Sequence, residues 1–290
     1  MLPTIKFRGH LHRSSGQSAS AVTIISIDQH YQQGDKFRAF CRAINEEYEK
    51  KNLIKLTVAE TGYLKRHYLR LDKNYSSSEE ADLAAMQLGE TWIKEQLSSL
   101  YSLNVPIEII SWKDLLEGQV SPADKPFEEY LTMVEETYKT DKVFIRDVDR
   151  LSKKYAEKLS ARYNPKQEEV LKKACLGAAK NYLFEESSII FKLIHRGFNA
   201  QLYPGNGNAA LRYIYKKFFG ETNPIPWIRY DIHDSSDIKE KKLRASTSQF
   251  FESSTSSNDS TQEKKGNTEG MISPLSNEGE SHSLKNFSLK

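Results

Sequence analysis

The sequence predicts an α/β fold in which helices cover both faces of a parallel sheet. Short apolar segments rich in β-branched residues alternate along the chain with longer segments of helical period. This alternation is typical of parallel strands joined by crossover helices. The chain has 290 residues, of which 38% are hydrophobic. That is enough for one large domain of this class.

Four segments have the composition of buried strands. They are AVTIISI, IKLTVAE, PIEIISW and NAQLYP, at 21–27, 54–60, 106–112 and 199–204. The first is an unbroken β-branched run that ends with a single hydroxyl, Ser26. Because side chains alternate along a strand, Val22, Ile24 and Ser26 are expected to share one face.

Segments of helical period lie between these strands. After the first strand a helix is predicted to begin near Gly34, with an apolar face of Phe37, Phe40, Cys41, Ile44 and Tyr48. Further helices are predicted at about 61–71, 78–100, 126–138, 142–163 and 166–191. We find no repeat and no internal domain break. The whole is therefore predicted to be one Rossmann-like layer.

The end of the chain has a different composition. From about 238 onward Ser, Thr, Asn, Glu and Gly dominate, and the few apolar residues follow no period. Such a segment cannot bury enough apolar surface to offset its ordering entropy. We therefore expect an N-terminal extension at 1–20, a folded domain at 21–237 and a disordered polar tail at 238–290.

Charge and cysteine usage narrow the class of protein. The net charge of +3 does not by itself indicate a polyanionic partner, so any basic surface must be local. Cys41 and Cys175 lack paired or CxxC spacing, which suits a reducing compartment and excludes a cysteine zinc site. No segment resembles a signal peptide or reaches the roughly eighteen apolar residues of a membrane span. We expect a cytoplasmic protein without membrane or metal partners.

Ser26 lies where open parallel sheets bind ligands, at the carboxyl end of a strand. The nucleotide motifs GxGxxG and GxxxxGK[ST] are absent, and Ser26 stands in Ile-Ser-Ile-Asp rather than in GxSxG. A serine at a strand end is more often a turn or cap residue than a nucleophile. A catalytic Ser26 would need backbone donors for an oxyanion and a group that manages protons.

Two other segments offer polar groups for such a site. Tyr182 and Glu186 are four residues apart on a predicted helix, so both project from one face, and apolar neighbours make the pair look partly buried. Pairs of this kind are also common on solvated helices. Tyr203 precedes Pro204 at the end of the fourth strand, where a turn would present its ring at the sheet edge. The alternative interpretation is that Tyr203 is an ordinary aromatic residue at the end of a strand, without a role in a site.

A basic ridge is predicted on one helix. Its members recur at intervals of four: Arg146, Arg150, Lys154, Lys158 and Arg162. The opposite side of this helix is apolar, with Val148, Leu151, Tyr155 and Leu159. A row of cations on the exposed side of a helix, opposite a buried apolar side, has the geometry to contact successive phosphates of a nucleic-acid backbone. Most rows of this kind, however, only contact solvent. Lys65 and Arg66 could extend the ridge.

These elements together resemble one family, the tRNA-dependent cyclodipeptide synthases. SIDQHYQQGDKF is similar to their serine motif, and AETGYLKRHYL is similar to their segment after the second strand. Tyr182-x-x-x-Glu186 resembles their helix pair, and Leu202-Tyr203-Pro204 resembles the segment of their later catalytic tyrosine. The Tyr-Pro sequence, with Gln29 three residues after Ser26, resembles the X-Y-P subfamily.

Two positions depart from the family pattern. Ser188 stands where members usually carry proline, two residues after the glutamate. The aspartate of the second motif appears as Ala59 or Glu60. Both departures affect the local geometry of these two motifs and not the resemblance to the family as a whole.

The resemblance implies a domain similar to the catalytic domain of class I tyrosyl- and tryptophanyl-tRNA synthetases, without ATP chemistry and without a cofactor. Two aminoacyl-tRNAs would be used per turnover, by a ping-pong reaction that yields a cyclic dipeptide. Ser26 would carry the aminoacyl group, Tyr182 and Glu186 would hold and deprotonate its amine, and Tyr203 would orient groups or relay a proton. The basic ridge would bind the first tRNA. The chain is expected to act as a monomer.

The substrate-binding residues expected from strand parity and from the family motifs are Val22, Ile24, Gln29, Ile189, Ile190 and Pro204. Two other functions stay open. The first is a non-catalytic RNA-binding module with a Rossmann-like fold. The second is a serine acyl hydrolase, although none of the seven histidines has a recognisable setting as its base.

Overall fold

The computed structural model describes residues 4–8, 18–47, 52–72, 74–160, 168–205, 207–222 and 224–233. Among them is one sheet of six strands in the order β1-β6-β5-β2-β3-β4. The strands are β1 (Thr4–Arg8), β2 (Ala19–Ile25), β3 (Leu53–Glu60), β4 (Ile107–Ser111), β5 (Ala200–Pro204) and β6 (Trp227–His233). Five strands, β2 to β6, are parallel, and β1 pairs antiparallel with β6 at one edge.

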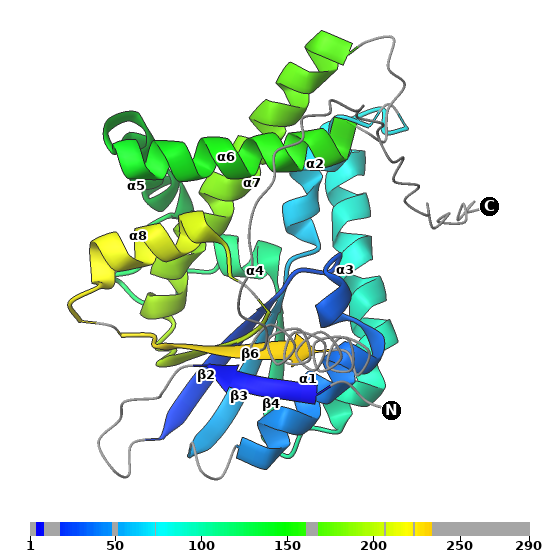
Figure 1. Ribbon diagram of the computed structural model, residues 1–290, viewed down its shortest axis with the longest axis vertical. Coiled ribbons are helices and arrows are strands. Elements are labelled where there is room, and N and C mark those ends of the chain that lie inside the picture. The colour runs from blue at the N-terminus through cyan, green and yellow to red at the C-terminus, as the bar shows by residue number, and fades with distance from the viewer. Residues whose placement is uncertain are drawn as a thin grey trace, which may run out of the picture. The chain divides into compact units, whose positions relative to one another are not determined.

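Helices cover both faces of this sheet, as the sequence predicts (Figure 1). The helical elements are η1 (His30–Gln32), α1 (Gly34–Glu47), η2 (Tyr63–Lys65), α2 (Arg66–Leu69), α3 (Ser78–Tyr101), α4 (Trp112–Glu117), α5 (Phe127–Thr140), α6 (Lys142–Ser160), α7 (Glu168–His195) and α8 (Ala209–Phe219). Helices α1 and α3 share one buried core with the sheet, while α4 to α8 share the other. In Figure 1 α6 crosses over α7 on that second face.

The strand order places a topological switch point beside β2. From β2 the chain moves to β3 and β4 on one side of the sheet, and it later returns to build β5 and β6 on the other side. Ala21 pairs with Ala200 and Val22 with Gln201 across the switch. In open parallel sheets the crevice for a ligand lies at the carboxyl ends of the two strands that flank this point. Ser26 follows one of those ends, and Tyr203 lies at the other.

Several elements differ from the sequence prediction. The first strand ends at Ile25, so Ser26 lies in the turn beyond it. Residues 4–8, expected to precede the domain, form edge strand β1, and β6 was missed because charged residues interrupt WIRYDIH. Helices α4 and α8 were also missed, and the helix predicted at 61–71 is two short elements, η2 and α2. Tyr48, Arg162 and the predicted tail at 238–290 lie outside the described residues.

Within the described ranges, no helix is both long and apolar enough to cross a lipid bilayer.

Candidate active site

Ser26 is held in place by contacts that cross the switch point. Its side chain is buried, and its hydroxyl Oγ donates a hydrogen bond to Asp28 Oδ1 at 3.0 Å. Its backbone N–H donates to the amide oxygen of Gln32, whose Nε2 donates in turn to the carbonyl of Pro204 at 3.3 Å. Gln32 is fully buried, and Trp92 Nε1 donates to its backbone carbonyl at 3.0 Å. Gln32 therefore ties the end of β2 to the end of β5.

Tyr182 lies on α7 inside a cluster of tyrosines. Its ring is stacked on that of Tyr68, with centroids 5.2 Å apart, and meets the ring of Tyr155 edge to face at 6.0 Å. Burial, followed by the negative charge of Glu186, raises the pKa of Tyr182 well above its ordinary value. The phenol is therefore neutral and able to donate a hydrogen bond.

Glu186 lies one turn further along α7 and is partly buried. Its Oε2 accepts a hydrogen bond of 2.6 Å from Asn208 Nδ2, at the N-terminus of α8. Burial raises the pKa of Glu186 to about 7, although the Asn208 bond and the positive charge of Lys65 act in the opposite direction. A carboxyl group with this pKa can gain or lose a proton near neutral pH, which is the property required of a general base.

Tyr203 reaches the site from β5. Its side chain is buried, its ring meets that of Trp227 edge to face at 5.5 Å, and it forms a hydrogen-bonding interaction with Tyr31. Burial raises the pKa of Tyr203 well above its ordinary value. The turn that follows requires glycine, because Gly205 has φ +94° and a Cβ there would lie 2.6 Å from Tyr31 Cε2.

Asp28 and Lys65 connect these groups. Lys65 Nζ lies 2.6 Å from Asp28 Oδ2 and 5.4 Å from the centroid of the Tyr182 ring. The charge of Glu186 also acts on Tyr203 and Tyr155. The four predicted catalytic residues thus gather at the carboxyl edge of β2 and β5. In the described part of the chain, no three His, Cys, Asp or Glu side chains group as a metal site.

Known proteins resemble this chain in overall structure rather than in sequence. No protein-family model matches the sequence, and no curated protein sequence matches it. Among solved structures, a cyclodipeptide synthase from Candidatus Glomeribacter gigasporarum bound to Phe-tRNAPhe is 28% identical, with a TM-score of 0.64. That match covers 76% of this chain and 90% of the other. The chain is similar in structure to the cyclodipeptide synthases.

Two further cyclodipeptide synthases share the fold at lower identity. The protein from Fluoribacter dumoffii is 19% identical, with a TM-score of 0.64 over 79% of this chain and 99% of that one. The protein from Bacillus thermoamylovorans is 14% identical, with a TM-score of 0.50 over 74% and 89%. Assignment to the X-Y-P subfamily stays a prediction.

The apolar residues expected to bind substrate lie in the core of this protein. Val22, Ile24, Ile189 and Ile190 are at most 2% exposed and belong to the same buried cluster as Tyr182 and Tyr203. Pro204 is buried at the end of β5. Gln29 is only partly buried and precedes η1, where its backbone N–H donates to the Ser26 carbonyl at 3.0 Å.

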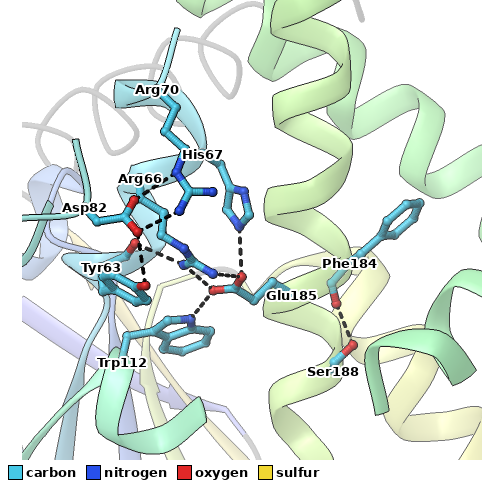
Figure 2. A network of polar contacts seen from close by, with 9 residues as sticks. All are labelled: Tyr63, Arg66, His67, Arg70, Asp82, Trp112, Phe184, Glu185 and Ser188. Carbon is cyan, nitrogen blue, oxygen red and sulfur yellow. Dashed lines mark hydrogen bonds and ion pairs between the residues drawn. The ribbon is translucent and has the colours of Figure 1, made fainter. Parts of the chain in front are cut away.

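Glu185, next to the catalytic candidate, belongs to a separate polar network (Figure 2). Arg66 donates to both of its carboxylate oxygens, Trp112 Nε1 donates to Oε1 at 2.8 Å, and His67 Nε2 lies 2.9 Å from Oε2. Burial acts to raise the pKa of Glu185, but His67 and Arg66 outweigh it and lower the pKa. The Arg66 side chain is 11% exposed. These contacts give Arg66 a structural role that sequence reasoning did not foresee.

The two departures from the family pattern have local explanations. Ser188 Oγ donates to the carbonyl of Phe184 at 2.8 Å (Figure 2), and α7 continues through this position because serine, unlike proline, keeps its backbone N–H. Glu60 ends β3 and accepts hydrogen bonds from the backbone N–H groups of Gly62 and Trp112, the first at 2.7 Å. It joins the start of η2 to the start of α4.

The predicted ridge is exposed on α6. The side chains of Arg146 and Arg150 are 70% and 66% exposed, and Lys154 and Lys158 are also exposed. Asp147 lies 3.6 Å from each arginine. The opposite side of α6 carries Tyr155, which contacts Tyr182, and an α-helix is only about 10 Å across. The ridge is thus separated from the site by little more than one helix diameter.

Sequence reasoning missed five residues of the site: Tyr31, Gln32, Tyr68, Tyr155 and Asn208. One of them carried a usable signal, because an asparagine directly before the helical pattern of α8 is typical of an N-cap, and Asn208 Oδ1 does accept from the Ala210 N–H at 2.8 Å. The others make contacts with residues far away in the sequence. A local pattern does not contain that information.

Proposed function

We propose that this protein makes a cyclic dipeptide from two aminoacyl-tRNAs by ping-pong catalysis through an aminoacyl ester of Ser26. One observation carries the proposal. In a chain that shares its fold with the cyclodipeptide synthases, Ser26 stands at the topological switch point with Tyr182, Glu186 and Tyr203 around it. The ester of a charged tRNA is already activated, so neither a phosphate-binding loop nor a histidine base is required.

In the first half-reaction Ser26 Oγ would attack the aminoacyl carbonyl and release the tRNA. Glu186 and the neutral Tyr182 phenol would hold the α-amine, and Glu186, with a pKa of about 7, would remove its proton. The amine then attacks the second aminoacyl-tRNA, which gives a dipeptidyl-enzyme. Tyr203 would orient the free amine as it attacks the Ser26 ester, and cyclisation releases the diketopiperazine.

The ridge on α6 would bind the acceptor arm of the first tRNA. Four exposed cations at intervals of one turn match a phosphate backbone, and this contact is expected to weaken with salt. The relative from Candidatus Glomeribacter gigasporarum was solved with a charged tRNA bound, which supports a tRNA partner. Such a partner would place the enzyme in the cytoplasm.

The first aminoacyl side chain would lie against Val22, Ile24, Ile189 and Ile190. These aliphatic residues favour an apolar amino acid, because a polar side chain would lose its hydrogen bonds to water there. Pro204 would close the site from β5.

The test is mass spectrometry of the medium from a heterologous host that expresses the protein. We expect a cyclic dipeptide that disappears in Ser26→Ala and is retained in Ser187→Ala, which removes another buried serine hydroxyl, one that has no hydrogen-bond partner within the described residues. Absence of any product from the parent protein with tRNA binding intact would favour the RNA-binding module. Hydrolysis of simple esters without tRNA would favour the acyl hydrolase.

A further inference from the structure

A chain of three polar side chains ends on the attacking oxygen. Ser26 Oγ donates to Asp28 Oδ1 at 3.0 Å, and Lys65 Nζ donates to Asp28 Oδ2 at 2.6 Å. Each carboxylate oxygen of Asp28 therefore has a partner on a different element, one on the turn after β2 and the other on η2. None of the steps proposed above uses Asp28.

Lys65 is held in one orientation by its surroundings. Its side chain is only 12% exposed, and its ammonium group lies 5.4 Å and 5.9 Å from the ring centroids of Tyr182 and Tyr68. Aromatic rings at these distances stabilise a cation and cover its far side. The sequence placed Lys65 in a tRNA-binding ridge. Its burial and its short contact with Asp28 point to the active site instead.

The Asp28 carboxylate is ionised at neutral pH. Burial acts to raise its pKa, but the charge and hydrogen bond of Lys65, together with the Ser26 hydroxyl, hold the pKa below the ordinary value. Asp28 therefore carries no proton of its own before the transfer. Its side chain is 52% exposed, so the side chain is accessible from solvent.

We propose that Asp28 relays the proton of Ser26 to the leaving ribose oxygen during acylation, and that Lys65 positions Asp28 for this transfer. The proposal rests on the aminoacyl transfer proposed above. As the bond from Oγ to the carbonyl carbon forms, the bond from that carbon to the ribose oxygen breaks. The proton moves from Oγ to Asp28 and then to the ribose oxygen, so Asp28 ends unprotonated and Lys65 keeps its proton throughout.

A relay of this kind suits the chemistry of the step. The attacking and leaving groups are both alcohols of similar acidity, so neither has to become a free alkoxide if a carboxylate passes the proton between them. The alternative is a purely local role, since Ser26 and Asp28 are two residues apart and the Gln29 N–H closes a turn onto the Ser26 carbonyl. A turn needs only a hydrogen-bond acceptor at position 28, whereas a relay needs a carboxylate.

The experiment measures single-turnover formation of the aminoacyl-enzyme by intact-protein mass spectrometry, with charged tRNA binding measured in parallel. The parent protein must form the adduct and Ser26→Ala must not; if the parent forms none, the proposed function itself fails. In Asp28→Asn, which keeps an acceptor, we expect acylation to slow by about 100-fold or more with tRNA binding unchanged. Acylation at the parent rate would overturn the relay.

A second variant tests the relay by comparing rates within one and the same protein, so the result does not depend on whether the substitution disturbs folding. In Asp28→Ala the half-exposed site leaves room for a small carboxylate, so added formate should restore part of the acylation rate, whereas formamide, of the same size but unable to accept the proton, should not. Equal rates with formate, with formamide and with neither would overturn the relay.

For Lys65 we expect slower acylation in Lys65→Met and partial recovery in Lys65→Arg, both with tRNA binding near that of the parent. If Lys65→Met weakens tRNA binding as much as it slows acylation, Lys65 is a phosphate contact rather than a positioning residue.

Discussion

Glu185 and Glu186 are neighbours on α7, yet their surroundings give them opposite properties. Glu185 lies among Arg66, His67 and Trp112, and its pKa is lowered. Glu186 faces the tyrosine cluster with one amide donor, and burial raises its pKa to about 7. Successive side chains of an α-helix point in directions about 100° apart. Glu185 therefore faces Arg66 and forms a structural ion pair, whereas Glu186 faces the tyrosine cluster, where burial raises its pKa.

This difference predicts the pH dependence of the enzyme. Glu186 must be ionised to remove a proton from the amine, so kcat/KM for product formation should rise as pH increases through about 7 and then level off. The measurement is product formation from charged tRNA between pH 6 and 8, corrected with Ser26→Ala for spontaneous ester hydrolysis. Glu186→Gln should be slower by about 100-fold or more and should lack this ascending limb. A parent profile that is flat across this range would contradict the role of Glu186.

The elements that present Lys65 depend on two glycines. Gly62 starts η2 and packs against Gly89 of α3, where a Cβ on Gly62 would lie 2.5 Å from the Gly89 nitrogen and 2.8 Å from the Ala85 carbonyl oxygen. Both contacts are with backbone, which cannot move aside as a flexible side chain can. The close approach of α3 to η2 therefore requires that position 62 has no side chain.

We expect Gly62→Ala to lower the free energy of unfolding by about 1–3 kcal/mol, because it forces extra volume into a packed contact. Chemical denaturation measures this change. Gly177→Ala on α7 is the matched control, since a Cβ there meets nothing within 4 Å. That control should be neutral, or stabilising by up to about 1 kcal/mol through helix propensity. Equal stabilities of the two variants would contradict the packing argument.

Helix α6 would connect the proposed tRNA contact to the chemistry, because its outer side carries the ridge and its inner side contacts Tyr182. Reversing two ridge charges, Arg150→Glu and Lys154→Glu, should weaken binding of charged tRNA. The slope of log affinity against log salt should fall by roughly one for each lost phosphate contact. Filter binding over a salt series measures both effects.

The control reverses two exposed cations on the helices of the other face, Arg38→Glu on α1 and Lys94→Glu on α3. The net charge changes equally, so only a localised contact distinguishes the two double variants. Equal loss of affinity in both would show that tRNA responds to total charge and not to the ridge.

The sheet of the molecule has a strand order typical of ligand-binding parallel sheets, with the candidate site at the switch between β2 and β5. Every residue placed in the catalytic steps lies between Ser26 and Asn208. A chain that ends at residue 238 should therefore retain synthesis of the cyclic dipeptide at a rate within about twofold of the parent. Comparison of purified full-length and truncated proteins tests this, and loss of activity with an unchanged unfolding transition would assign the polar tail a part in the reaction.

Local pattern by itself determined the α/β class, the serine at the end of the first strand, the Tyr182 and Glu186 pair and the exposed side of α6. These features depend on composition and on periods of two and 3.6 residues, which a sequence displays directly. Tertiary structure alone decided that burial raises the pKa of Glu186 and not that of Glu185, that Lys65 pairs with Asp28, that Asn208 donates to Glu186, and that Gln32 joins two strand ends. Gln32 and Pro204 are 172 residues apart in the chain. Contacts over such a separation arise only when the sheet brings its strand ends together, and no local pattern encodes them.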